Sequence, residues 1–146
     1  MPASITFRVL PAQIPYKTLM AFRRDAGWDN TDAAERCHHP GGRVQWVTME
    51  TGSKVIGIAR LEIAQPQFCF VSDFVVLSSQ RRRGRGQWFM GQIEQYCRQI
   101  GIPHVLLQPT VASEGFYARL DFVSDTRVAG FLKKDIRPFP RRLPIH

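Results

Sequence analysis

The sequence of 146 residues lacks the features of a membrane protein or of a disulfide-rich secreted protein. It contains no run of roughly 18 consecutive apolar residues, the length that a membrane-spanning helix needs. The opening segment, MPASITFRVLP, has no basic stretch followed by an apolar one, so we expect no export signal. The three cysteines, Cys37, Cys69 and Cys97, are odd in number and have no CxxC spacing, which argues against a disulfide framework. These absences predict a cytoplasmic protein with no membrane partner.

Metal-ligand patterns are also scarce. The segment CHH at 37–39 is the one candidate, but two adjacent histidines without a second cluster of ligands are more typical of a polar loop. The sequence therefore predicts no metal site.

Acidic residues are few, since 12 Asp and Glu stand against 20 Lys and Arg and give a formal net charge of +8. Such an excess indicates an anionic partner, which can be nucleic acid, an acidic surface or a phosphorylated small molecule. The excess is concentrated in two places, RRRGR at 81–85 and KKDIRPFPRRLPIH at the end of the chain. Net charge alone does not choose among these partners.

The hydrophobic pattern predicts one mixed α/β domain over residues 1–134, followed by a basic, proline-rich tail over 135–146. Apolar residues at helical spacing predict three helices, over 15–26, 87–100 and 112–120. Alternating or continuous apolar runs predict six strands, with a hairpin formed by the second and the third. The strand at 68–77 is apolar on both faces, so we expect it inside the sheet. The predicted strands cover residues 5–9, 43–50, 53–64, 68–77, 104–108 and 127–134.

The segment RRRGRG at 81–86 joins this apolar strand to the clearest helix of the sequence. The first N–H groups of a helix have no partner within the helix, and the helix dipole places positive potential there. Glycines let the backbone approach an anion closely, and arginines add forked, permanently charged donors. A pyrophosphate fits such a turn.

Other phosphate-binding motifs do not match this segment. No Gly-Lys-Ser/Thr follows, as a P-loop would require, and the three glycines of the dinucleotide fingerprint are missing. Segments rich in Arg and Gly also occur in tails that bind nucleic acids, so the position after a buried strand is the informative feature.

The segment and its surroundings resemble the GNAT superfamily of acyl-CoA-dependent N-acetyltransferases. The likeness starts from the family motif [Gln/Arg]-x-x-Gly-x-[Gly/Ala] at 81–86, and includes SDFVVLSSQ before it, HVLLQ after the helix, and FYARLDF at 116–122. RRDAGWDN at 23–30 is similar to the end of the family's first helix and the loop that follows. The resemblance covers most of residues 5–134 and implies a mostly antiparallel sheet of six or seven strands flanked by helices.

The resemblance also implies acetyl-CoA as co-substrate and a set of residues that bind it. The strand around Val75, Val76 and Leu77 would separate from its neighbour and pair with the pantetheine arm. Ser113 lies where relatives have a polar contact to coenzyme A, although helix capping accounts for Ser113 equally well. The pyrophosphate would be held at the motif and the residue after it, namely Arg81, Arg82, Arg83, Gly84, Arg85, Gly86 and Gln87.

Three residues depart from the family pattern. Arg82 stands where glycine is common, and Arg85 stands where an aliphatic residue is usual. Asp121 replaces the glycine that the family has before the final Phe of its Phe-Tyr-x-x-Leu-Gly-Phe segment. The first two affect the phosphate contacts, and the third affects the local turn.

In this family an amine attacks the thioester directly and a thiolate leaves. Tyr117 lies where the family has a tyrosine near the sulfur, so we expect it to act as the general acid; otherwise its ring packs in the core. Asp73 is a carboxylate inside an apolar strand, and it either assists the amine or pairs with an arginine such as Arg60. Trp28 and Asp29 lie in the loop that the resemblance places beside the acceptor.

The sequence thus predicts an N-acetyltransferase that moves an acetyl group from acetyl-CoA to a primary amine of a small molecule or peptide, through a ternary complex. The resemblance also suggests a homodimer. Two alternatives stay open, an acyl-CoA-binding sensor without turnover and a module that binds nucleic acid or another anionic partner. Binding to a phosphate backbone would weaken steeply with added salt, which separates the last alternative from the others.

Overall fold

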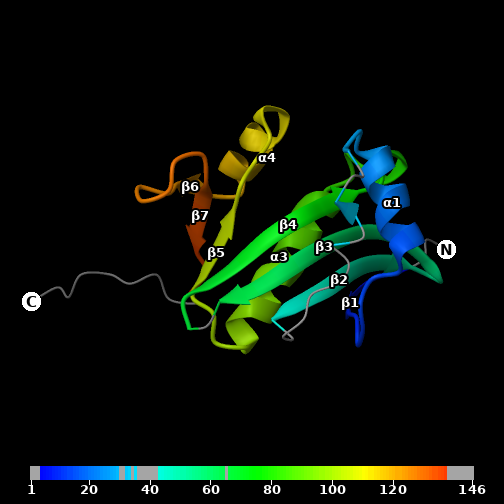
Figure 1. Ribbon diagram of the computed structural model, residues 1–146, viewed down its shortest axis with the longest axis horizontal. Helices are drawn as coiled ribbons and strands as arrows, with labels where there is room; N and C mark the ends of the chain where they lie inside the picture. Colours follow the sequence, from blue (N-terminus) through cyan, green and yellow to red (C-terminus); the bar gives the residue numbers. More distant parts are fainter. Residues whose placement is uncertain (1–3, 30–31, 34, 36–42, 65, 138–146) are drawn as a thin grey trace, which may run out of the picture.

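The computed structural model describes residues 4–29, 32–33, 35, 43–64 and 66–137, which form one seven-stranded sheet with helices on both faces (Figure 1). The strands lie in the order β1-β2-β3-β4-β5-β7-β6. The elements are β1 (Ile5–Val9), α1 (Tyr16–Asp25), β2 (Val44–Thr51), β3 (Lys54–Ala64), β4 (Phe68–Val76), η1 (Ser78–Gln80), α3 (Arg85–Gln99), β5 (His104–Leu107), η2 (Val111–Ser113), α4 (Glu114–Arg119), β6 (Val123–Ser124) and β7 (Leu132–Asp135).

The sheet is mixed but mostly antiparallel, as predicted. Strands β1 to β4 form an antiparallel meander that includes the predicted hairpin of β2 and β3. The crossover through α3 makes β5 parallel to β4, and β7 then pairs antiparallel with both β5 and β6. Strand β4 lies between β3 and β5, which confirms that its apolar sequence belongs inside the sheet.

Two clusters of buried side chains cover the two faces of the sheet. Phe89, Ile93 and Cys97 of α3 are fully buried in one cluster, as the periodicity of this helix predicts. Leu19 and Phe22 of α1 belong to the other cluster, where they join buried residues of β2, β3 and β4. Figure 1 shows α1 in front of the sheet and α3 behind it. Strand β4 thus contributes buried side chains to both clusters.

Each of α1, α3 and α4 ends in a Schellman motif, in which a left-handed residue directs two amides back onto the last turn. Gly27 and Gly101 occupy this position after α1 and α3, with φ of 78° and 83°. Asp121 occupies it after α4, with φ of 71°. The amides of Asp121 and Phe122 donate to Ala118 and Tyr117 at 3.1 Å each. The turn after α4 is therefore closed in the same way as the turns after α1 and α3, with aspartate in place of glycine.

One predicted strand is wrong in its first half. Residues 127–134 were expected to be extended, but β7 begins at Leu132, because the Phe131 amide donates to the Val128 carbonyl at 3.3 Å and Gly130 has φ of 83°. These contacts close a turn rather than extend a strand. The preceding strand, β6, has two residues and is too short for any periodicity to reveal.

Some sequence predictions fall outside the described residues, namely CHH at 37–39 and the end of the tail, 138–146. Over the described ranges, no group of three or more His, Cys, Asp and Glu side chains is placed to hold a metal ion. In the same part of the chain, no helix has the length and hydrophobicity needed to cross a membrane.

Candidate cofactor and acceptor site

The sheet opens between β4 and β5. The two strands pair from Phe68 with His104 as far as Val71 with Leu107, while β4 continues along β3 to the pair of Val76 with Gly57. The Leu77 amide donates to the Ile56 carbonyl of β3 at 2.9 Å. Because successive backbone groups of a strand point to opposite sides, the N–H and carbonyl of Val76 point away from β3, into this opening. The predicted separation of the strand around residues 75–77 is therefore present.

The segment RRRGRG lies where β4 leads into α3, with two residues in the left-handed region. Arg82 has φ of 68° and Gly84, the N-cap of α3, has φ of 71°. The N-cap makes no side-chain hydrogen bond, and within the described part of the chain the backbone amides of 82–87 meet no backbone acceptor. A series of unpaired amides at the positive end of a 15-residue helix is a favourable anion site.

The side chain of Arg81 is about half exposed, and its guanidinium connects this segment to two neighbouring elements. Its Nε donates to the Val76 carbonyl at 2.9 Å, and its Nη2 lies 3.6 Å from Asp25 Oδ2. Asp25 also accepts the Ser78 amide and hydroxyl, both at 2.9 Å. The end of α1, the end of β4 and the turn before α3 are thereby tied together. The side chains of Arg82 and Arg83 are exposed, so they remain available to an anion.

Gly86 lies close to a side chain of α4. A Cβ built on Gly86 would lie 3.2 and 3.3 Å from two ring carbons of Phe116 on α4, tighter than ordinary van der Waals contact. Gly91, further along the same helix, has open space at its Cβ position. The start of α3 and the start of α4 thus touch at Gly86.

Tyr117 lies beside the opening of the sheet and is buried, with 7% of its surface exposed. Its ring packs edge-on against Phe74, which belongs to the part of β4 beyond the last pair with β5, at 6.3 Å between centroids. Phe116 and Phe122 pack against the same ring at 5.1 and 5.6 Å. Burial raises the pKa of Tyr117 to about 12, because the phenolate would lose hydration. The hydroxyl therefore carries its proton at neutral pH.

Asp73 sits at a bulge in β4, with φ of 49° and a side chain that is 1% exposed. Its Oδ1 lies 2.5 Å from Arg23 Nη1, so the ion pair that the sequence left open is made with an arginine of α1. The Arg23 guanidinium also donates to the Asp29 carbonyl from both Nε and Nη2, and lies 5.8 Å from the centre of the Trp28 ring. The two predicted acceptor residues, Trp28 and Asp29, are in this way attached to β4 at Asp73.

Ser113, the predicted cofactor contact, and Glu62, an acidic residue of β3, have local roles in the structure. Ser113 forms a capping box with Thr110, in which each side chain accepts the other residue's amide, at 2.9 and 3.2 Å. Glu62 accepts a hydrogen bond from Arg60 at 3.2 Å on β3. These contacts favour the capping explanation for Ser113, while its contact to a cofactor stays a prediction.

Sequence reasoning missed Arg23, Phe74 and Phe116. Arg23 follows the apolar Phe22 in a helix that also carries Arg24, and nothing local distinguishes the buried arginine from the exposed one. Phe74 follows the bulge in β4. The extra residue there places the Phe74 side chain on the opposite face of the sheet from the one that simple alternation predicts. The Phe116 contact depends on the absence of a side chain at Gly86, 30 positions earlier in the chain.

Comparison with protein families identifies the class of protein. The model of the acetyltransferase (GNAT) family matches residues 12–122. The chain therefore belongs to this family, and the resemblance seen in the sequence is confirmed. Comparison with curated proteins finds no match.

Solved structures with the same fold include several N-acetyltransferases. Tetrahymena GCN5 aligns with a TM-score of 0.75 at 15% identity, over 92% of this chain and 98% of that one. The ribosomal-protein-S18-alanine N-acetyltransferase of Escherichia coli aligns with a TM-score of 0.66 at 14% identity, over 96% and 100%. PaiA N-acetyltransferase of Thermoplasma acidophilum, in complex with coenzyme A, aligns with a TM-score of 0.66 at 13% identity, over 90% and 99%. At these identities the likeness shows the fold alone.

Proposed function

We propose that this protein transfers an acetyl group from acetyl-CoA to a primary amine, by direct attack of the amine within a ternary complex. The observation that carries the proposal is the run of unpaired amides at 82–87, at the start of α3 and beside the opening between β4 and β5. Membership of the acetyltransferase family supplies the class of reaction.

In this proposal the amides of 82–87 bind the pyrophosphate, and the helix dipole with the nearby arginines neutralises its charge. The pantetheine arm adds to β4 along Val75, Val76 and Leu77, where β5 has separated. The Val76 amide, which points into the opening, donates to the oxyanion formed when the amine attacks the thioester. One strand therefore both binds the cofactor and stabilises the tetrahedral intermediate.

An alkylammonium with a pKa of about 10.4 must lose its proton to solvent water before it attacks, at a cost of roughly 4–5 kcal/mol at neutral pH. Asp73 is held by Arg23 and fixes the loop with Trp28 and Asp29, which forms one side of the acceptor site in our proposal. Tyr117 then donates a hydrogen bond to the departing thiolate and shares its proton with it, since a thiolate with a reference pKa of about 8.5 needs only part of that proton. The phenol is available as this donor because burial keeps it protonated at neutral pH.

Binding of coenzyme A tests the proposal without any knowledge of the acceptor. We expect calorimetry to show binding by the wild-type protein, and binding weakened at least about tenfold by Gly86→Ala, because the added Cβ displaces the start of α3 or Phe116. Gly91→Ala is the matched control on the same helix and should keep the affinity of the wild type. Absence of coenzyme A binding by the folded wild-type protein would refute the cofactor assignment.

Turnover is tested by thiol release from acetyl-CoA against a panel of aminoglycosides, polyamines, amino acids and peptides, with the acetylated product identified by mass. Cofactor binding without release across such a panel would favour the acyl-CoA sensor over the enzyme. Binding of a nucleic acid that weakens steeply between about 50 and 200 mM salt, without binding of coenzyme A, would favour the anionic-partner module.

A further inference from the structure

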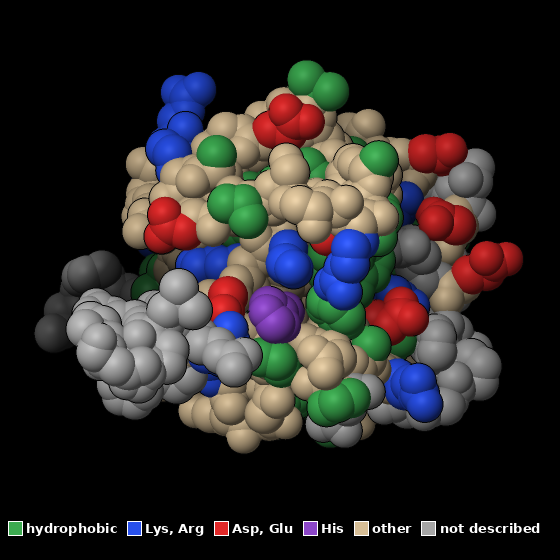
Figure 2. Space-filling view, turned by 90° about the vertical axis from the view of Figure 1, so that its left-hand side faces the viewer, with side chains coloured by type: hydrophobic (Ala, Val, Ile, Leu, Met, Phe, Trp, Pro, Cys, Tyr) green, Lys and Arg blue, Asp and Glu red, His purple; other side chains and the backbone are tan. Residues whose placement is uncertain are grey.

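Positive charge alone does not single out one arginine of the segment 81–86. Figure 2 shows Lys and Arg side chains spread over another face of the molecule, on the side of β7, with Asp and Glu side chains between them. Arg81 is distinguished by its two contacts within the chain, one with the Val76 carbonyl and one with the Asp25 carboxylate. These contacts, rather than its charge, indicate what Arg81 does.

The peptide group that joins Val76 and Leu77 is held from both sides. On one side, the Leu77 amide donates to the Ile56 carbonyl of β3 at 2.9 Å. On the other side, the Val76 carbonyl points into the opening of the sheet and accepts a hydrogen bond from Arg81 Nε, also at 2.9 Å. Strand β5 does not reach this carbonyl, because its last pair with β4 joins Val71 and Leu107. The Arg81 guanidinium thus takes the place of the missing strand.

Asp25, in the last turn of α1, orients the guanidinium. Its Oδ2 lies 3.6 Å from Arg81 Nη2, on a different nitrogen from the one that binds Val76. Asp25 is itself fixed, because it accepts the amide and the hydroxyl of Ser78 at 2.9 Å each. A planar guanidinium that is engaged at two of its nitrogens has a defined direction, so Arg81 is turned toward β4 and α1.

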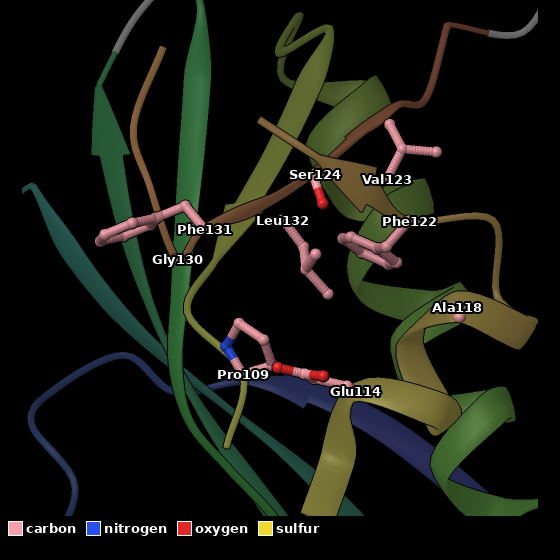
Figure 3. Close-up of a pocket in the computed structure, with 9 residues that line it drawn as sticks. All are labelled: Pro109, Glu114, Ala118, Phe122, Val123, Ser124, Gly130, Phe131 and Leu132. Atoms are coloured by element: carbon pink, nitrogen blue, oxygen red, sulfur yellow. The ribbon is translucent and has the colours of Figure 1, made fainter. Parts of the chain in front are cut away.

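The largest cavity near this part of the sheet leaves the Val76 carbonyl untouched. A cavity of about 450 Å³ lies between α4 and the hairpin of β6 and β7 (Figure 3). Its lining residues, as far as the chain is described, fall between 109 and 132 and include Glu114, Phe122 and Leu132. None of these belongs to β4 or to 78–87, so a ligand in this cavity would not replace Arg81 at the carbonyl.

We propose that Arg81 is a positioning residue, which fixes the Val76–Leu77 peptide group through Nε and does not bind the pyrophosphate. This inference rests on the proposed function, because the pantetheine arm of coenzyme A is what adds to β4 at this peptide group. A peptide group that is already fixed loses less conformational freedom when the arm binds. The pyrophosphate contacts then belong to the amides of 82–87 and to the exposed arginines Arg82 and Arg83.

Two substitutions separate the hydrogen bond of Arg81 from its charge. In Arg81→Gln, the amide nitrogen lies as many bonds from the backbone as Arg Nε does, so the donor is kept and the charge is lost. In Arg81→Met, a methyl group occupies that position, and both the donor and the charge are lost. Calorimetry with coenzyme A in about 0.5 M salt suppresses the effect of charges that do not touch the ligand.

Arg81→Met should weaken binding of coenzyme A about fivefold to tenfold, the loss expected for one hydrogen bond, while Arg81→Gln should stay within about twofold of the wild type. Arg83 gives the matched contrast on the same segment. Arg83→Gln and Arg83→Met remove the same charge from an exposed side chain, so these two variants should resemble each other. A difference between Gln and Met is therefore expected at position 81 and not at position 83.

The chemical shift of the Val76 carbonyl carbon, measured on the folded protein without cofactor, reports on the contact itself. It should move in Arg81→Met and stay close to the wild-type value in Arg81→Gln. The same spectra show whether each variant is folded.

Equal weakening by Gln and Met at position 81 would show that charge matters there, and would overturn the proposal in favour of a pyrophosphate contact. Unchanged affinity in both variants, or an unmoved Val76 carbonyl carbon in Arg81→Met, would overturn it as well. Failure of the folded wild type to bind coenzyme A would refute the proposed function instead. The carbonyl shift would then still decide whether Arg81 fixes this peptide group.

Discussion

Replacement of Tyr117 by Phe keeps the buried ring and removes the proton, so it separates packing from chemistry. The ring contacts with Phe74, Phe116 and Phe122 remain in this variant. If Tyr117 is the general acid, kcat falls by about 10²–10⁴, the usual contribution of a positioned acid, while binding of acetyl-CoA is retained. The assay is thiol release at saturating acetyl-CoA with an amine that the wild type accepts.

The same substitution also changes how the stability of the protein depends on pH. The size of this effect follows from the pKa of Tyr117. The pKa of Tyr117 is about 12 in the folded protein and near 10 when unfolded, so the folded state keeps the proton longer. Below pH 10 both states are protonated and the contribution to stability is fully present. As the pH rises from 10 through 12, the unfolded state ionises first and about 2.7 kcal/mol of stability is lost.

Urea unfolding at pH 9 and at pH 11.5 measures this loss. Between these values the wild type should lose about 2 kcal/mol more of its free energy of unfolding than Tyr117→Phe does, since all other titrating groups are common to both. Equal losses would show that the phenol is not held in its buried, protonated state. Unchanged kcat in a folded variant would remove Tyr117 from the mechanism whatever the unfolding experiment shows.

Other substitutions test the structure around the site by thermal or urea unfolding. Asp121→Gly should stabilise the protein by about 1 kcal/mol, because glycine adopts the left-handed conformation without the clash of a side chain. Gly101→Ala, at the equivalent position after α3, should destabilise the protein by about 1 kcal/mol. If the two substitutions changed the free energy of unfolding in the same direction, the assignment of these turns would be contradicted. Arg23→Met leaves Asp73 as a buried carboxylate without its guanidinium and should cost about 3–5 kcal/mol. Retention of wild-type stability by that variant would show that the pair does not hold α1 to β4.

Most of the elements could be predicted from the sequence, and the exceptions have physical causes. Helices α1 and α3 could be predicted from their periodicity and from Gly27 and Gly101, which end them, α4 from its periodicity alone, and β4 from its apolar run. The two-residue β6 carries no periodic signal, and the turn at 128–131 resembled a strand because Val128 and Phe131 are apolar. The turn at 81–87 before α3 could be predicted because a strand, glycines and a helix start follow one another in the chain, and its binding of a pyrophosphate is our proposal.

The sequence by itself determined where a helix start with unpaired amides lies, since these amides depend on backbone groups only a few residues apart. It could not determine that Asp73 pairs with Arg23, 50 positions away, or that Arg81 is held by Val76 and Asp25. Nor could it place Glu114 in a pocket formed with β6 and β7. Contacts between distant segments depend on strand register and on which face a side chain occupies, and a one-residue bulge such as that at Asp73 changes both. Only the folded chain decides them.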